Sequence, residues 1–519
     1  MNTKRVLWLS AAIAAAILIA VGGVRAAAQE QPRTGGTLRV AMIGEPPTLD
    51  LHWTSATIIY EITGHIYETL FTTDAKYQNV PLLAEGYEAL DGLKRYVIRL
   101  RKGVKFHNGK EMTSADVVAS LKRWGRRGTG SAVFKAVEAV EAKDPYTVEI
   151  RLKEPSAVLT TALGQIPNGA AIYPKEVVEA AGDGQIKQYI GTGPFKFVEH
   201  KPDRHIRLAR FDGYSARSEP PTGYGGRRTA YVDEILFIPV PDVAIREAGV
   251  RTGEYHFAQQ LKTDAYARLK GLPDVEPVVI KPYGWATIIM NAKQGLMTNK
   301  KLRQAFQARL DVEPMMQAAM GNPDFYRIDP GLFFPEQPWH SKAGAELYNQ
   351  RNKEKARQLL KESGYQGQPI RWIVTKEYEY HYKPAVVAKA QLEEVGFNID
   401  LQVLDWATVV QRRVKPELWD IFSTGMSFVV EPTTGAQILC EYPGWWCNPE
   451  KEALLQALTR ESDTKKRQAI MDKVQALFYE DAARMRLGDY FRMDLRRKEV
   501  RGFEPGPRMH FWNVWLESR

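Results

Sequence analysis

The pattern of hydrophobic and polar positions predicts strands near the N-terminus and a regular succession of helices and strands later. Apolar residues alternate over 38–42, which is typical of a strand, and Gly-Glu-Pro-Pro ends it. Isoleucines recur at helical spacing over 58–66. Residues 195–210 favour two strands joined by the polar turn Lys-Pro-Asp-Arg. The first half is therefore rich in strands.

After Gly284 helical and strand patterns alternate. Helices are predicted at 300–309, 353–363, 383–395, 448–460 and 464–480. Strands are predicted at 370–374, 398–404 and 420–424. This alternation predicts an α/β domain with a mixed or mostly parallel sheet. The 519 residues exceed one ordinary core and contain no low-complexity linker, which favours domains that exchange segments of chain.

The first 28 residues differ from the rest. Lys4 and Arg5 precede an uncharged, mostly apolar run over 6–24, and three alanines end at Ala28. This is the three-part pattern of a secretory signal peptide, cleaved near Ala28. An uncleaved membrane anchor is the alternative, because the run could just span a bilayer. We therefore expect an exported, soluble mature chain.

Few sequence motifs suggest metal binding or catalysis. The nine histidines show no His-x-x-x-His spacing, and the cysteines show no Cys-x-x-Cys spacing. The sequence contains no Gly-x-Ser-x-Gly elbow and no phosphate-binding loop. The formal charge of +10 is spread along the chain, which does not favour a nucleic-acid partner. We expect no metal site, no cofactor and no enzymatic activity.

The two cysteines, Cys440 and Cys447, are predicted to form a disulfide, because an exported chain meets an oxidising compartment. A redox-active pair is the alternative. Such pairs normally use Cys-x-x-Cys spacing, whereas six residues intervene here. A structural role is therefore favoured.

Several ordered segments carry a family resemblance. They are VKFHNGKEMTSADVVASLKRW (104–124), GTGPFKFVEH (191–200), VDEILFIPVPD (232–242), KLRQAF (301–306) and ARQLLKESGY (356–365). In this order they resemble the extracytoplasmic solute-binding proteins of the peptide/nickel transporter family, which supply ABC importers. LDWATVV (404–410) and WDIFSTG (419–425) further resemble the dipeptide-binding branch.

The resemblance implies a bilobed α/β periplasmic-binding-protein fold with an extra inserted domain and a ligand cleft between the lobes. Lobe I would comprise 29–76, 186–284 and 488–519, the inserted domain 77–185, and lobe II 285–487. Hinge closure around a ligand is the expected motion.

The resemblance also suggests ligand contacts. Apolar walls are expected from Trp285, Trp406 and Phe428. Polar contacts are expected from Glu45, Tyr378, Tyr380 and Glu431. For each of these residues, packing in the core or a place on the surface is the alternative to ligand contact.

Phe428 departs from the family pattern. Peptide binders of the family place an aspartate shortly before a Glu-Pro or Asp-Pro pair, where it holds the ligand's α-ammonium, and Phe428 takes that place before Glu431-Pro432. A buried ammonium without a carboxylate would be severely penalised. Either Glu431 substitutes for the aspartate, or the ligand has no free ammonium.

The expected function is that of a monomeric periplasmic component of an ABC importer. It would capture a peptide-like or other small polar solute and deliver it to the permease and ATPase subunits. The alternatives are an exported carboxylate-dependent hydrolase and a sensory binding protein for a membrane receptor.

Overall fold

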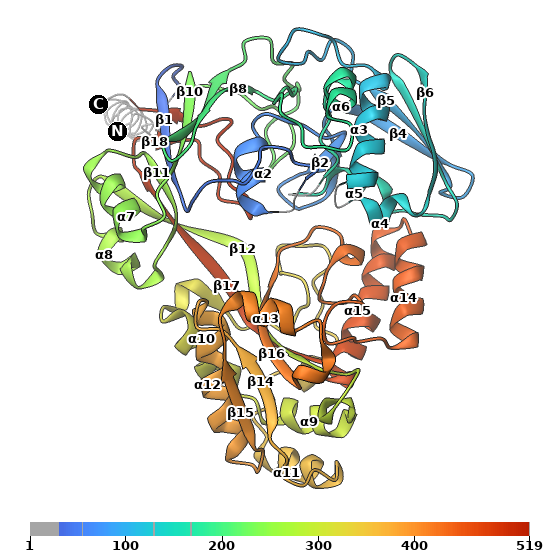
Figure 1. Cartoon of the computed structure of the whole chain (residues 1–519), viewed down its shortest axis with the longest axis vertical. Helices are drawn as coiled ribbons and strands as arrows, with labels where there is room; N and C mark the ends of the chain where they lie inside the picture. The colour runs from blue at the N-terminus through green and yellow to red at the C-terminus, as the bar shows by residue number, and fades with distance from the viewer. Residues whose placement is uncertain (1–30, 54–55, 128–129, 167–168, 518–519) are drawn as a thin grey trace, which may run out of the picture.

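The computed structural model describes residues 31–53, 56–127, 130–166 and 169–517. The predicted signal peptide and its cleavage site lie outside these residues. The chain forms an upper and a lower part, joined by two long strands (Figure 1). Within the described residues no helix is both long and apolar enough to cross a bilayer.

One mixed sheet of eleven strands runs through both parts. Its order is β15 (Ile399–Val403), β14 (Ile370–Val374), β16 (Ile421–Ser427), β12 (Val275–Met290), β17 (Arg484–Arg497), β11 (Phe257–Leu261), β1 (Thr37–Met42), β10 (Glu234–Pro239), β9 (His205–Arg210) and β8 (Phe195–Lys201), and β13 (Tyr326–Arg327) pairs with β17. Both parallel and antiparallel pairs occur, which confirms the predicted mixed sheet.

Strands β12 and β17 form the connection between the two parts. They pair antiparallel from Val275 opposite Arg497 to Ile289 opposite Arg484, and the register shifts between Ile280 and Gly284. Above the shift β17 also pairs with β11, and below it β12 also pairs with β16. The predicted boundaries at 284/285 and 487/488 both fall inside this strand pair.

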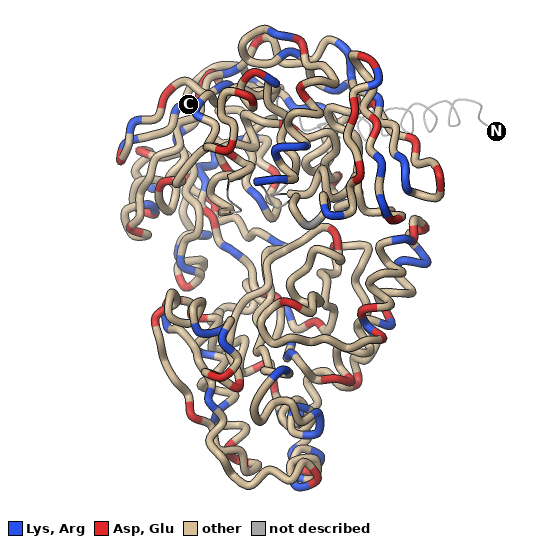
Figure 2. The backbone as a smooth tube through the Cα atoms, turned by 45° about the vertical axis from the view of Figure 1, so that its right-hand side comes forward, with Lys and Arg blue, Asp and Glu red and all other residues tan. Residues whose placement is uncertain are grey.

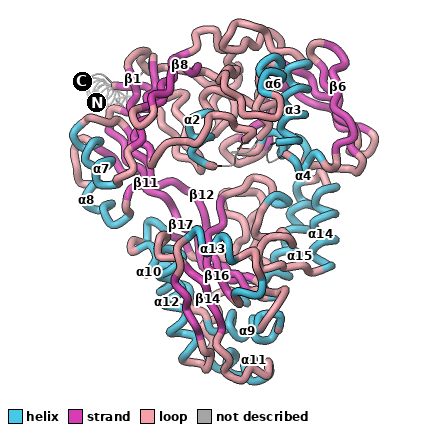
Figure 3. Tube along the Cα trace, viewed as in Figure 1, coloured by secondary structure: helices cyan, strands magenta, loops and turns pink. Residues whose placement is uncertain are grey.

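The lower part is a three-layer α/β/α arrangement (Figure 3). In β14, Ile370, Trp372 and Val374 face one buried cluster, and Ile373 faces another. A parallel strand covered on both faces is apolar at nearly every position, as β14 is. The helices are α9 (Lys300–Arg309), α10 (Val312–Met320), α11 (Lys353–Glu362), α12 (Glu379–Glu393), α13 (Trp406–Arg412), α14 (Pro449–Arg460) and α15 (Thr464–Asp481).

The helices and strands predicted after Gly284 are all present, with small differences in their bounds. The largest difference is in α12, which begins at Glu379 and runs through Pro384, whereas the prediction started at 383. Strand β16 extends to Ser427, beyond the predicted end at 424. In the first half, the predicted helical spacing over 58–66 forms only α2 (Thr57–Thr63), because the chain turns at Gly64.

The upper part contains a second, antiparallel sheet. Its order is β4 (Ala84–Leu90), β5 (Arg95–Leu100), β7 (Thr147–Leu152) and β6 (Val137–Asp144). Leu121 and Trp124 of α3 (Ser114–Arg127) belong to the buried cluster that covers it. The remaining elements are β2 (Phe71–Thr73), β3 (Asn79–Pro81), α4 (Ser131–Phe134), α5 (Leu159–Gly164), α6 (Lys175–Ala181), α7 (Val243–Thr252), α8 (Tyr266–Lys270), β18 (Val500–Arg501) and β19 (Trp515–Leu516).

Strand β17 was missed at the sequence level because charged residues fill its buried positions. Arg484, Arg486, Asp489, Arg492 and Asp494 are all buried. The fold neutralises part of this charge by pairing within the strand. Arg486 contacts Asp489, and Arg492 donates to Asp494 at 2.8 Å.

The predicted Cys440–Cys447 disulfide is present. It closes a short loop that follows β16 and precedes α14. Both ends of this loop are held in the lower part, since Lys451 donates to the carbonyls of Ile438 and Trp446 at 2.7 Å.

Replacing Asp489 with alanine should destabilise the protein by about 3–5 kcal/mol, because Arg327 and Arg486 would lose their shared buried carboxylate. Urea unfolding followed by tryptophan fluorescence measures the change. The matched control is Glu276→Ala, which breaks the exposed pair with Arg496 and should cost less than about 1 kcal/mol. Equal effects of the two substitutions would contradict the structural role of Asp489.

The double substitution Cys440→Ser, Cys447→Ser should lower the free energy of unfolding by about 2 kcal/mol, because the unfolded chain regains the freedom of the closed loop. The measurement compares oxidised wild type with the variant in urea. An unchanged stability would show that the crosslink contributes nothing to the fold.

Candidate functional site

The carboxyl ends of three parallel strands lie together at one edge of the lower part. Strand β14 pairs in parallel with β15 on one side and with β16 on the other. Tyr378 follows β14, Trp406 follows β15 and Phe428 follows β16. In open α/β sheets this edge is where ligands bind. Helix α13, which begins at Trp406, lies at the end of the lower part that faces the upper part (Figure 1).

Three of the predicted contact residues form one aromatic cluster. The Trp406 ring centroid lies 5.5 Å from that of Tyr378 and 5.2 Å from that of His381. The Tyr380 ring lies 4.6 Å from His381 and stacks on Tyr490 at 4.2 Å. Tyr378 is 37% exposed, whereas Tyr490 is buried, so the cluster reaches from the surface into the core.

His381 was missed at the sequence level. It is buried, and neither ring nitrogen has a hydrogen-bond partner in the described structure. Burial, with a smaller effect of the nearby Arg413 charge, lowers the pKa of His381 to about 3. His381 is therefore neutral at pH 7, with a donor and an acceptor free. No sequence pattern around His381, which directly follows Tyr380, marks it as a site residue.

The two predicted residues nearest the disulfide loop are buried and already have partners. Phe428 packs against Tyr77 of the upper part, with ring centroids 4.6 Å apart, and against Phe334. Glu431 accepts two hydrogen bonds from Arg467, at 2.7 and 2.9 Å. The carboxylate of Glu431 is thus neutralised by a protein cation.

Trp285 and Glu45 contact partners other than the rings of the aromatic cluster. Trp285, on β12, is buried under the guanidinium of Arg486, 4.7 Å from its ring centroid. Glu45 accepts a hydrogen bond from the N–H of Asp203 at 2.8 Å and lies 3.2 Å from His200. The partners of Glu45 belong to the β8–β9 hairpin of the upper part. Ligand contact by either residue stays a prediction.

A cavity of about 340 Å³ lies between the two parts. Its walls include Tyr77, Asn79 and Thr160 from the upper part, and Trp339, Glu431 and Arg467 from the lower part. Asn79 donates to Thr160 at 3.2 Å, but its own Oδ1 is buried without a partner. Burial, reinforced by Glu336, raises the pKa of Tyr77, so its hydroxyl stays protonated. The cavity therefore offers both hydrogen-bond donors and acceptors.

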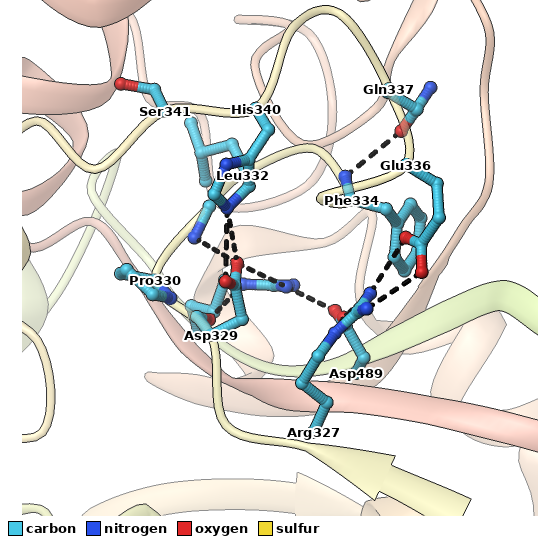
Figure 4. A network of polar contacts seen from close by, with 12 residues as sticks. Arg327, Asp329, Pro330, Leu332, Phe334, Glu336, Gln337, His340, Ser341 and Asp489 are labelled. Carbon is cyan, nitrogen blue, oxygen red and sulfur yellow. Dashed lines mark hydrogen bonds and ion pairs between the residues drawn. The ribbon is translucent and has the colours of Figure 1, made fainter. Parts of the chain in front are cut away.

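The loop that supplies Trp339 to this cavity is held by a charged network (Figure 4). Arg327 donates to both oxygens of Glu336, at 2.8 and 3.0 Å, and to Asp489 on β17 at 2.7 Å. Asp329 lies 3.0 Å from His340 at the far end of the loop. Trp339, the residue before His340 in this loop, donates from its indole N–H to the carbonyl of Val430 at 2.9 Å. The network thus fixes one wall of the cavity to the central strand.

Acidic and basic residues are interspersed over both parts, and the described residues form no cluster of three or more His, Cys, Asp or Glu that could hold a metal ion (Figure 2). The arrangement is that of a pocket between two bodies that share a pair of strands.

Comparison with known proteins agrees with this geometry. A family model described as bacterial extracellular solute-binding proteins, family 5 Middle, matches residues 78–440. The chain belongs to this family. It is a binding protein by descent, and no comparison supports the alternatives of a hydrolase or a sensory protein.

Named relatives cover most of the chain. The probable peptide ABC transporter periplasmic-binding protein y4tO of Sinorhizobium fredii is 28% identical over 476 residues, which cover 86% of this chain and 88% of the relative. The structure of oligopeptide-binding protein AppA from Bacillus subtilis, in complex with a nonapeptide, matches with a TM-score of 0.75 at 24% identity, covering 94% of this chain and 100% of AppA. The ABC transporter substrate-binding protein CtaP of Listeria monocytogenes matches with a TM-score of 0.82 at 21% identity, over 94% of this chain and 100% of CtaP. The two solved structures share the fold of this solute-binding protein.

Trp406→Ala should weaken binding of the protein's solute about tenfold or more, because the partly exposed indole of Trp406 is the largest ring of the cluster. Isothermal titration with a solute identified by thermal shift measures the change. Trp53→Ala, at an exposed position of the upper part, is the control and should leave affinity unaltered. Unchanged affinity of Trp406→Ala would remove this residue from the site.

Proposed function

We propose that this family 5 protein is the periplasmic solute-binding component of an ABC importer. It captures a peptide-like or other small polar solute between its two parts and delivers it to the permease and ATPase subunits. The observation that carries the proposal is the cavity of about 340 Å³ whose walls come from both parts. The printed names of y4tO and AppA support a peptide-like solute.

The size and polarity of the cavity favour a small solute. Ligand pockets usually measure about 300–1,000 Å³, so this cavity lies near the lower limit. Its tyrosine, asparagine and threonine side chains suit a polar molecule. A short peptide or a molecule of similar size fits this description better than a long extended peptide.

The proposed solute has no α-ammonium bound at the position of Phe428. Phe428 is apolar and packed against Tyr77, and the nearby Glu431 is committed to Arg467. An ammonium buried there would lack a counter-charge, which would weaken binding severely. We therefore interpret Glu431 as a structural residue. We also infer that the solute has no free ammonium group at this position.

The proposed motion is a hinge closure of lobe II (285–487) toward lobe I (29–76, 186–284 and 488–519), with 77–185 as the inserted domain. The register shift between Ile280 and Gly284 supports a hinge at this point, because ladder hydrogen bonds are interrupted there. The mature protein would act as a periplasmic monomer after removal of residues 1–28. It binds and releases its solute without chemical change.

A thermal-shift screen tests the proposal. Mature protein is heated with peptides of two to five residues, opines and sugars, each at millimolar concentration. A solute at about 100 times its Kd should stabilise the folded state by about 2.7 kcal/mol. At least one member should raise the melting temperature, and a raised concentration should raise it further. Absence of stabilisation by every member would contradict the proposed function.

A further inference from the structure

The turn between α14 and α15 forms one wall of the cavity between the two parts, because Glu461 of this turn lines it. In Figure 1 this helix pair lies directly below α4 and α5 of the upper part. The backbone N–H of Ala157 in the upper part donates to the carbonyl of Thr459 at 2.7 Å, and Arg460 lies 3.5 Å from Glu154. The upper part therefore holds the chain just before Glu461 in place.

The charged side chains of the cavity wall carry a net negative charge. They are Glu431, Glu461 and Arg467. Arg467 is fully engaged, since its Nη2 donates to both oxygens of Glu431, and its Nη1 donates to the carbonyls of Leu458 at 2.8 Å and Glu461 at 3.2 Å. An anionic solute would therefore meet the carboxylate of Glu461 without gaining a free cation of the protein.

The carboxylate of Glu461 is the charge that the fold leaves unbalanced. Its Oε1 accepts the N–H of Asp463 at 2.8 Å, but the group makes no ion pair with any residue that the structure describes. The neighbouring Arg460 pairs with Glu154 instead. The N-terminus of α15, which would otherwise attract an anion, is already capped by Asp463, whose side chain accepts from the N–H of Lys466 at 2.9 Å.

The uncharged groups of the wall also suit a cation. The faces of aromatic rings attract cations, and Tyr77, Tyr87 and Trp339 all line the cavity. Arg467 already lies 4.9 Å from the ring centroid of Trp339. Asn79 adds an acceptor, since its Oδ1 receives no hydrogen bond from the described residues. A group rich in N–H donors would satisfy such acceptors.

We propose that this cavity binds a cationic nitrogen group of the solute, an ammonium or a guanidinium, with Glu461 as its counter-charge. The proposal rests on the proposed function, because it names the chemical class of solute that the same cavity takes. The cation lies against the turn between α14 and α15 and not at Phe428, where the packed ring supplies no counter-charge. Since Asn79 and Glu461 belong to different parts, this subsite is complete only when the two parts are closed.

The test compares cationic probes with neutral probes of the same shape. In the first series, peptides of two to five residues are acetylated at the N-terminus and amidated at the C-terminus, and contain either one arginine or one citrulline. In the second series, peptides without basic side chains carry either a free α-ammonium or an acetylated N-terminus. Binding is measured by calorimetry at pH 7 and low ionic strength.

Four proteins are compared: the wild type, Glu461→Gln, Glu461→Lys and the control Glu354→Gln. The glutamine at 461 keeps an oxygen that can accept the N–H of Asp463, so this substitution removes the charge and preserves the local hydrogen bond. The control removes an exposed carboxylate of α11, whose side chain is 86% exposed. Circular dichroism monitors the fold of each variant.

The wild type should bind the cationic probe of at least one series about tenfold or more tightly than its neutral counterpart. Glu461→Gln should reduce this ratio to about one, Glu461→Lys should invert it, and Glu354→Gln should equal the wild type. A preference in the first series identifies a guanidinium, and a preference in the second identifies an ammonium.

Equal binding of cationic and neutral probes by the wild type would overturn the proposal and leave the proposed function intact. A preference of the wild type that Glu461→Gln leaves unchanged would overturn it as well, because the counter-charge would then lie elsewhere. If neither variant at 461 folds, the ratio measured with the wild type decides alone. Failure of every probe to bind would contradict the proposed function itself.

Discussion

Asp489 lies in the middle of the large sheet with no exposed surface, and Arg327 and Arg486 share its carboxylate. Its strand, β17, pairs with β12, β11 and β13, so this ion pair sits where the upper and lower parts are joined. Burying the charges of Asp489 and Arg486 is costly unless they are paired. Their ion pair, with Arg327 as a second, partly exposed partner, is what allows β17 to occupy a central position in the sheet.

The candidate site depends on this arrangement through two routes. Arg327 connects Asp489 to Glu336, and thereby holds the loop that brings Trp339 to the cavity. Tyr490, the residue after Asp489, provides the ring on which Tyr380 stacks. Both the wall of the cavity and the aromatic cluster are therefore positioned from the same point on β17. A change in the pairing of β12 with β17 would move both of them together, as the proposed hinge closure requires.

Sequence patterns were informative where local physics determines structure. The helix over 300–309 and the strand over 370–374 have the bounds that periodicity predicted, because each has a complete apolar face or an apolar run. The parallel order of β14, β15 and β16 then explains why Tyr378 and Trp406 meet. Patterns failed for β17, because its buried positions are charged and only the folded partners neutralise them.

The same limit applies to the site. The carboxylate of Glu431 is paired with Arg467, which lies thirty-six positions later in the chain. No local sequence spacing predicts an ion pair over such a separation. His381 carried no signal in the sequence either, since only its burial without side-chain hydrogen bonds sets it apart. Some side chains are set apart because a residue distant in the sequence pairs with them, or because no residue does. Such side chains can be identified only from the folded structure.

The proposed function requires that a small solute is held between the two parts. A crystal structure of the mature protein, with a solute retained through mild purification and identified by mass spectrometry, tests this requirement. We predict density for the solute between Tyr77 and Asn79 on one side and Trp339 on the other, or against the aromatic cluster of Tyr380 and Trp406, with both parts in contact. A solute bound to one part alone, away from these residues, would contradict it.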